Sequence, residues 1–150
     1  MTITASPSAR LEVPDDGIQI LDGLPGFPEV RWLHLAAVDD YGIFVRVIDA
    51  SDERLWFLAV NPFVYFADYE VRIDDEDQRL LEAEPDDEIV IYSLVAVDRS
   101  DGSMNANLMA PLVIDVTRRT ARQVVLDADL PVRAPLPKKP LGDDAEVSTS

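Results

Sequence analysis

Asn107-Leu-Met-Ala-Pro-Leu-Val-Ile-Asp115 is the stretch of sequence that decides the fold. It is apolar on both sides of Pro111, yet a central strand would reject this residue, because proline donates no N–H to a sheet ladder. A surface loop, in turn, would not gather Leu108, Met109 and three further large apolar residues. The stretch therefore predicts a short buried segment that kinks at Pro111 and re-enters a sheet.

Three further motifs support this interpretation. Gly23-Leu-Pro-Gly-Phe27 predicts a tight turn, because Pro25 fixes φ and Gly26 supplies the positive φ that a type II turn needs next. Asn61-Pro62 ends an apolar strand, since the residue before a proline is held extended and proline cannot donate a ladder bond. Asp68-Tyr69-Glu70 closes the extended aromatic segment that we expect after it.

Short apolar runs separated by turns fill most of the chain. Their length and spacing predict an all-β, mainly antiparallel fold, in which one compact domain over residues 10–135 curls into a β-barrel-like or sandwich structure. Acidic residues crowd the first turn of one short predicted helix, Asp75–Leu81. Residues 1–9 and 136–150 are expected to be a disordered leader and tail. The expected strands are Leu11–Val13, Ile18–Leu21, Trp32–Val38, Ile43–Ile48, Leu55–Val60, Ile89–Val97, Met104–Met109, Val113–Val116 and Gln123–Leu126, with a short edge at Leu130–Ala134.

Composition limits the classes of function. The net charge of −16 argues against direct binding of nucleic acid or of an anionic membrane, since both require clustered Lys and Arg. The same charge favours a basic protein partner, although it also serves solubility. The absence of cysteine excludes disulfides and thiol catalysis. Because neither a signal peptide nor a membrane-spanning run is recognisable, we expect a cytoplasmic protein.

Candidate motifs for catalysis or metal binding do not develop into sites. His34 is the only histidine, so a histidine triad or a zinc site lacks its other members. The acidic runs Asp74–Asp77 and Asp86–Glu88 do not have the spacing of an EF-hand loop and are typical of a solvated surface. Gly23–Gly26 lacks the spacing of a phosphate-binding loop. We therefore expect no catalytic residue, no metal site and no cofactor.

The aromatic residues between Trp56 and Tyr69 are core residues by default, but alternate strand positions face opposite ways. Some of the later ones should therefore face the surface, where aromatic side chains beside acids suit a protein interface. Asn107 has an alternative role as a cap of the kink before Pro111. The predicted partner-binding residues are Asn61, Phe63, Tyr65, Asp68, Tyr69, Glu70, Asn107 and Met109.

Taken in order, the four motifs resemble the FliW family of flagellar assembly factors over roughly Leu11–Pro135. Asn107–Ile114 is similar to the family's Asn-Leu-x-Ala-Pro-Leu-Val-Ile signature, and Gln123 fits the strand that follows it. The resemblance implies a compact β-barrel-like fold. It also implies a non-enzymatic regulator, monomeric when free, that binds flagellin and alternately sequesters the translational regulator CsrA, relieving the repression of flagellin synthesis.

Three positions depart from the family pattern. The family often has Leu-Gln-Ser where this chain has Val47-Ile48-Asp49, and its signature commonly closes on Asn where this chain has Asp115. A glycine commonly precedes the late strand where this chain has Ala121-Arg122. These changes bear on individual contacts and leave the expected fold intact.

A second class of function remains open at this point. A small ligand-binding or hydrolytic β-barrel protein using acidic residues would need a deep polar pocket and would retain a ligand or ion on purification. For the regulator, the acidity suggests a mechanism, because a strongly negative protein held against a basic RNA-binding protein should disfavour RNA there.

Overall fold

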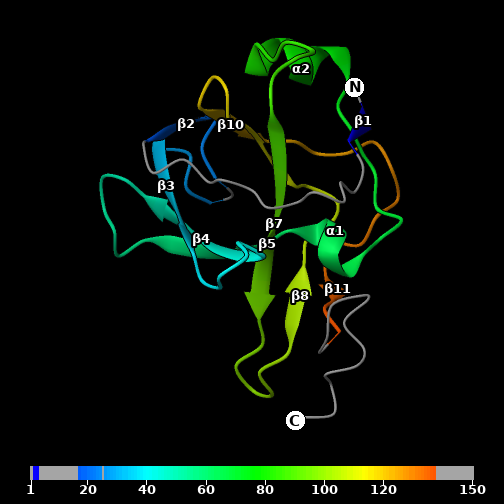
Figure 1. Cartoon of the computed structure of the whole chain (residues 1–150). Helices are drawn as coiled ribbons and strands as arrows, with labels where there is room; N and C mark the ends of the chain where they lie inside the picture. Colours follow the sequence, from blue (N-terminus) through cyan, green and yellow to red (C-terminus); the bar gives the residue numbers. More distant parts are fainter. Residues whose placement is uncertain (1, 4–16, 25, 138–150) are drawn as a thin grey trace.

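A computed structural model describes residues 2–3, 17–24 and 26–137 of the chain. Seven strands close into a barrel in the order β7-β5-β4-β3-β2-β10-β9, and β9 pairs back onto β7 (Figure 1). Every pairing in this ring is antiparallel except that of β10 with β2. The prediction of a mainly antiparallel β-barrel is confirmed. The barrel strands are β2 Ile18–Leu21, β3 Trp32–Ala37, β4 Phe44–Asp49, β5 Trp56–Val60, β7 Ile89–Val97, β9 Leu112–Asp115 and β10 Thr120–Gln123.

The other elements extend or cover the barrel. Strand β8 (Met104–Ala106) continues the sheet from β7, and β11 (Ala134–Pro135) adds an edge to β8. Helix α1 (Pro62–Tyr65) follows β5. Helix α2 (Asp75–Leu81) has the bounds that the sequence predicts and lies at the top of the molecule in Figure 1. A separate pair joins β1 (Thr2–Ile3) to β6 (Val71–Arg72). None of the helices in the described part of the chain has the length and hydrophobicity to cross a membrane.

Strand alternation places one hydrophobic core inside the barrel. Leu33 and Leu35 of β3 and Val45 and Val47 of β4 all point inward and are almost fully buried. Tyr92 of β7 is the largest fully buried side chain, and its hydroxyl donates to the Gly42 carbonyl oxygen at 3.0 Å. The interior is therefore filled by side chains.

A second core covers part of the outside of the barrel. It packs the outward side chains of β7 and β9, Ile91 and Val113, against Val71, Leu81 and other residues of the crossing segments. Because β7 is buried on both faces over its first half, its sequence is an apolar run interrupted only by the buried Ser93. The two cores together fix the crossing segment that follows β5.

The kinked segment before Pro111 is confirmed and is held by the residues of its own motif. The Asn107 side-chain oxygen accepts the backbone N–H groups of Met109 and Ala110 at 3.0 and 3.1 Å. From the following strand, the Gln123 amide donates to the Ala110 carbonyl oxygen at 3.0 Å. Asn107 thus caps the kink, which is the alternative role that the sequence suggests for it.

The glycine motif forms the expected turn. Phe27 N–H donates to the Leu24 carbonyl oxygen at 2.8 Å, and Gly26 has a φ of 77°. Gly23 also has a positive φ, and a Cβ atom there would lie 2.5 Å from the Cα atom of Pro28. Both glycines are therefore required by the backbone. Pro25 lies outside the described residues.

The expectation of an extended segment after Asn61 is wrong for residues 62–65, which form α1. The Asn61 side chain accepts the Phe63 N–H at 3.0 Å and acts as the N-cap, while Pro62 occupies the first helical turn. Asn followed by Pro is a helix-start signal as well as a strand-end signal. Here Asn61-Pro62 has both meanings, because it ends β5 and begins α1.

Other boundaries differ from the expected ones. Strand β10 ends at Gln123, because Val124 and Leu126 instead donate to the carbonyl oxygens of Pro111 and Met109 in the kinked segment. Thr2 and Ile3, expected within a disordered leader, pair with β6. The predicted strand Leu11–Val13, the rest of the leader and residues 138–150 of the tail lie outside the described residues.

The buried hydrogen bond of Tyr69 yields a stability prediction. Its hydroxyl donates to the Leu108 carbonyl oxygen at 2.6 Å and ties the β6 segment to the kink. Tyr69→Phe leaves that buried carbonyl without its donor, so we expect a loss of about 1–2 kcal/mol of unfolding free energy in urea denaturation. The exposed Tyr41 supplies the control, and Tyr41→Phe should change little. Equal losses in the two variants would contradict this role for Tyr69.

Candidate functional site

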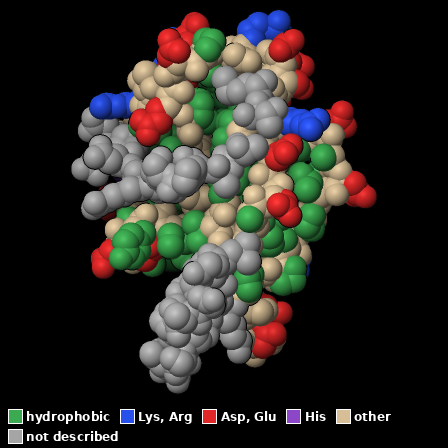
Figure 2. Space-filling model, turned by 45° about the vertical axis from the view of Figure 1, so that its right-hand side comes forward, with side chains coloured by type: hydrophobic (Ala, Val, Ile, Leu, Met, Phe, Trp, Pro, Cys, Tyr) green, Lys and Arg blue, Asp and Glu red, His purple; other side chains and the backbone are tan. Residues whose placement is uncertain are grey.

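An open groove of about 660 Å³ lies between the segment around β6 and the segment after β10. Asp68, Tyr69 and Glu70 line one side of it, and Val125 and Asp127 line the other. Figure 2 turns this side of the molecule forward and shows acidic side chains set among apolar ones. The groove therefore combines an apolar lining with a rim of carboxylates.

The rim carboxylates fall into two groups. Asp74 caps α2 by accepting the Asp77 N–H at 2.8 Å, and Asp77 forms an ion pair with Arg122 at 3.2 Å. These two acids are part of the fold. Asp68, Glu70 and Asp127 are exposed, and within the described part of the chain the one ion pair among them joins Glu70 to the exposed Arg72 at 3.5 Å. Such exposed pairs contribute little stability, so these three carboxylates are available to a partner.

Arg122 fixes the end of the groove that lies beside α2. Its guanidinium binds Asp77 of α2 and also Asp22, in the turn after β2. Burial raises the pKa of Asp77, and the hydrogen bond from Arg122 opposes this effect. The position of Arg122 is one of those that depart from the FliW pattern, and here it links α2 to two elements of the barrel.

The structure brings the predicted partner-binding residues into one region but gives them different exposures. Asp68 and Glu70 are exposed at the groove, and Phe63 and Met109 are half-buried. The side chains of Asn61, Tyr65 and Tyr69 are buried and engaged in the cap and the second core. The buried members can support a surface only by positioning the exposed ones. Their part in partner binding stays a prediction.

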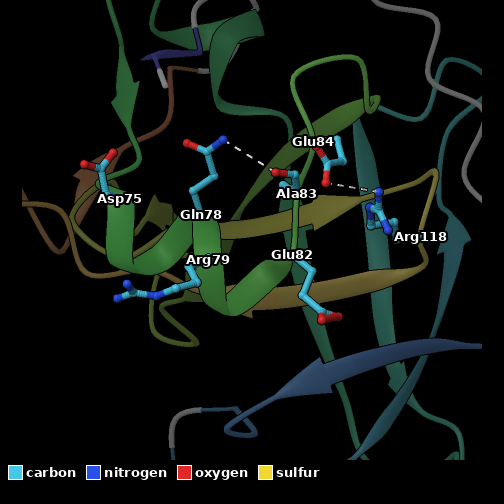
Figure 3. A pocket seen from close by; sticks show the side chains of 7 residues that line it. All are labelled: Asp75, Gln78, Arg79, Glu82, Ala83, Glu84 and Arg118. Atoms are coloured by element: carbon cyan, nitrogen blue, oxygen red, sulfur yellow. Dashed lines mark hydrogen bonds and ion pairs between the residues drawn. The ribbon is translucent and has the colours of Figure 1, made fainter.

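A second, shallow hollow lies beside α2 (Figure 3). Its polar side chains largely interact with groups of the hollow itself, since Gln78 donates to the Ala83 carbonyl oxygen at 3.5 Å and Glu84 pairs with Arg118 at 3.8 Å. Figure 3 shows Arg79 and Glu82 pointing away from these pairs. The hollow gathers no converging acid and base. Among the described residues, no group of three or more His, Cys, Asp or Glu is placed to hold a metal ion.

Asp115 and Asp87 form a pair of carboxyl groups with opposite pKa shifts. Burial raises the pKa of Asp115 to about 6, and the neighbouring Asp87 adds to this effect. The hydrogen bond from the protonated Asp115 lowers the pKa of Asp87 to about 2. The hydrogen bond from the Glu84 N–H and the ion pair with Arg118 at 2.8 Å lower it further. Asp115 is fully buried, and its Oδ1 accepts the Arg118 N–H at 3.0 Å. This burial keeps the pair away from any substrate.

The two tryptophan side chains are exposed and lie outside the predicted partner-binding residues. Trp32 and Trp56 are 50% and 46% exposed on β3 and β5, whereas the later aromatics of the predicted interface are covered. The exposure of the two tryptophans follows from the alternation of side chains along a strand. Trp32 precedes Leu33 and Trp56 precedes Phe57, and both of these neighbours point into the barrel. The expectation that Trp56 is a core residue is therefore wrong.

The fold and its surfaces define a small β-barrel protein with an acidic groove on one side. A family model described as FliW protein matches residues 3–136. The chain belongs to the FliW family. It is 31% identical to the flagellar assembly factor FliW of Carboxydothermus hydrogenoformans, over 92% of each chain, and 33% identical to that of Treponema denticola, over 85% of this chain and 86% of the relative.

A solved structure agrees with this assignment. A crystal structure of the flagellar assembly factor FliW superimposes with a TM-score of 0.74 at 26% identity, covering 93% of this chain and 99% of that one. The resemblance noted from the four motifs is thus confirmed, and the chain is a flagellar assembly factor of the FliW family.

The carboxyl pair yields a pH-dependent prediction. An unfolded Asp115 would lose its proton near 3.8, but the folded protein keeps it up to about pH 6. The buried charge of Asp115 therefore lowers the free energy of unfolding increasingly between about pH 3.8 and pH 6. Below this range it has no effect, and above it the effect is complete. We expect Asp115→Asn to raise the unfolding free energy by about 1–3 kcal/mol at pH 8 and to change it little near pH 4.

The matched control is Asp49, a buried carboxylate that accepts the backbone N–H and the hydroxyl of Ser51 at 3.0 and 2.8 Å. Because its oxygen has these donors, Asp49→Asn should not stabilise the protein at any pH. Urea denaturation across the pH range measures both variants. A gain for Asp115→Asn that did not depend on pH would contradict the account of the carboxyl pair.

Proposed function

We propose that this chain is a non-enzymatic, cytoplasmic regulator that is monomeric when free and acts through two protein partners. One partner is flagellin, and the other is a CsrA-type translational regulator that represses flagellin synthesis. Binding of the regulator by this protein relieves the repression. Newly made flagellin then captures the protein, releases the regulator and shuts synthesis down, so that linked binding equilibria suffice and no chemistry is required.

The acidic groove is the observation that carries the proposal for the basic partner. Asp68, Glu70 and Asp127 stand exposed around apolar side chains such as Val125. A basic RNA-binding protein would place Lys and Arg against these carboxylates and apolar side chains against the lining. The surrounding negative charge, −16 for the whole chain, then repels RNA from the same surface.

Some of the acidic residues are tied into the fold and are unsuitable for a test of this mechanism. The acidic run at Asp74–Asp77 begins α2, and Asp77 holds Arg122. Asp87 holds Arg118 beside the buried Asp115. Neutralising Asp77 or Asp87 would disturb the fold together with any binding. The three exposed groove carboxylates allow a cleaner test.

The alternative of a hydrolytic β-barrel finds less support. Its strongest candidate is the Asp115–Asp87 pair, whose separated pKa values are typical of acid and base partners. Both carboxyl groups are engaged with backbone N–H groups and Arg118, and Asp115 is fully buried. We assign the pair to structure.

The direct test is calorimetric titration of the wild-type protein with flagellin from the same cell and, separately, with its CsrA-type protein. We expect sub-micromolar binding to each and competition when both are present. Failure to bind either partner would contradict the proposed function and leave only membership of the family and the fold.

The groove assignment is tested by Asp68→Asn, Glu70→Gln and Asp127→Asn together. We expect at least a tenfold loss of affinity for the CsrA-type protein at about 50 mM salt, shrinking as the salt rises, because screening removes the contribution of exposed charges. RNA displacement should weaken in parallel.

A control variant with the same change in net charge combines Glu29→Gln, Asp40→Asn and Glu53→Gln, which are exposed positions away from the groove. This control separates a local effect from a general loss of negative charge. Equal losses in the two triple variants would overturn the assignment of the groove, while leaving a role for the overall charge.

A further inference from the structure

Among the residues that the structure describes, the outer surface of the barrel is covered on one half and open on the other. The second core packs over the outside of β7 and β9, as described above. On β3, β4 and β5, the side chains that alternate with the core residues face outward instead, and many of them remain accessible. Trp32, Arg46 and Trp56 are exposed, while Ile48 and Leu58 are half-buried. We call the open half the tryptophan face; its residues are Trp32, His34, Ala36, Arg46, Ile48, Trp56 and Leu58.

The composition of the tryptophan face differs from that of an ordinary solvated strand face. Antiparallel strands with one face in water usually alternate between apolar inward and polar outward residues. The tryptophan face has no carboxylate, although the chain contains 29 Asp and Glu residues. It also carries both tryptophans of the chain. Tryptophan and arginine are enriched, and acids depleted, at the centres of protein interfaces.

Cross-strand pairing makes these side chains one continuous surface. His34 of β3 lies opposite Ile48 of β4, which lies opposite Trp56 of β5. The Arg46 guanidinium lies over the Trp56 ring, 5.5 Å from its centroid. Arg46 forms no ion pair with any described residue, so its charge can accept a carboxylate from outside. The aromatic ring holds the guanidinium in place for such a contact.

The size of the tryptophan face suits a helix. Three strands spaced about 4.8 Å apart, each about five residues long, give a surface of roughly 10 by 17 Å. A helix rises about 5.4 Å per turn, so this length seats about three turns. One apolar stripe of an amphipathic helix can therefore cover the two tryptophans and Ile48 together.

We infer that the tryptophan face binds flagellin, through an apolar helical stripe flanked by a carboxylate that reaches Arg46. This inference rests on the proposed function and assigns a surface to one of its two partners. The positive charge of Arg46 on the tryptophan face favours flagellin over the CsrA-type protein as the partner bound there. A basic RNA-binding protein meets no carboxylate here and is repelled by Arg46, whereas it finds at least three available carboxylates at the acidic groove.

The properties of a filament subunit fit the same surface. A protein that polymerises exposes its apolar assembly surface before it reaches the filament. An uncovered apolar surface of this kind promotes aggregation. The tryptophan face offers apolar cover without the negative charge that surrounds it. The two partner surfaces then lie on different sides of the barrel, with β3 and β4 on the left of Figure 1 and the groove segments on the right. Competition between the partners therefore acts through negative coupling of two separate sites and not through overlap on one surface.

The chain itself supplies the probe for this inference, because its two tryptophans both lie on the tryptophan face. Protein labelled with 5-fluorotryptophan should give two fluorine resonances, assigned with Trp32→Phe and Trp56→Phe. We expect both resonances to shift or broaden when unlabelled flagellin is added, and neither when the CsrA-type protein is added. Flagellin binding that leaves both resonances unchanged would overturn the inference.

Variants test the energetics. Trp56→Ala should weaken flagellin binding at least tenfold, as expected for a central tryptophan. Arg46→Glu should weaken it at least fivefold, while Arg46→Lys keeps most of the affinity. Each variant should bind the CsrA-type protein within twofold of wild type, which also reports that it is folded. Val132→Ser, at a 59% exposed apolar residue outside the tryptophan face, is the matched control.

The outcomes separate the inference from the proposed function. Wild-type protein that binds no flagellin would contradict the proposed function itself. Wild-type binding that survives Trp56→Ala and Arg46→Glu would overturn only the surface assignment. Fluorine shifts that follow the concentration of the labelled protein alone would show a second copy on the face and would likewise overturn the assignment to flagellin.

Discussion

Strand β7 buries both of its faces over its first half, and the organisation of the molecule depends on this constraint. Its inward side chains, Val90 and Tyr92, fill the barrel, while Ile91 faces outward into the second core. The strand pairs with β5 and with β9, so it also closes the ring. A strand buried on both faces needs cover outside the barrel, and the crossing segments from α1 to α2, together with the kinked segment, supply it.

That cover creates the two surfaces that we connect with function. The segments around β6 and after β10, which complete the second core, also meet along the acidic groove. The opposite strands β3 and β4 have no such role and leave the tryptophan face accessible. One packing requirement on β7 and β9 thus divides the exterior into a covered half with an acidic groove and an open half whose outward strand residues, the tryptophan face, include no carboxylate.

The sequence predicts the parts of this structure that depend on local rules. Ile18–Leu21, Ile89–Val97 and the helix Asp75–Leu81 lie where their patterns place them, because alternation, continuous hydrophobicity and capping are local signals. The kink at Pro111 was predictable for the same reason. Helix α1 was missed because Asn61-Pro62 carries two meanings, and tertiary packing decides between them.

The candidate site was less accessible to sequence reasoning. The sequence identified Asp68 and Glu70, but it could not show that Tyr65 and Tyr69 turn inward, because their burial depends on segments distant in the chain. Asp127 and Val125 join the groove only through the fold. The pair formed by Asp87 and Asp115 likewise arises from contact between the segment before β7 and the end of β9, although the sequence alone shows that Asp115 departs from the family pattern.

The central claim is that two partners use different halves of the exterior, and carboxyl footprinting by mass spectrometry tests it most directly. The exposed carboxylates of the wild-type protein would be labelled when it is free, when it is bound to the CsrA-type protein and when it is bound to flagellin. We expect Asp68, Glu70 and Asp127 to lose labelling with the CsrA-type protein and to keep it with flagellin. Equal protection of these three residues by both partners would contradict the account.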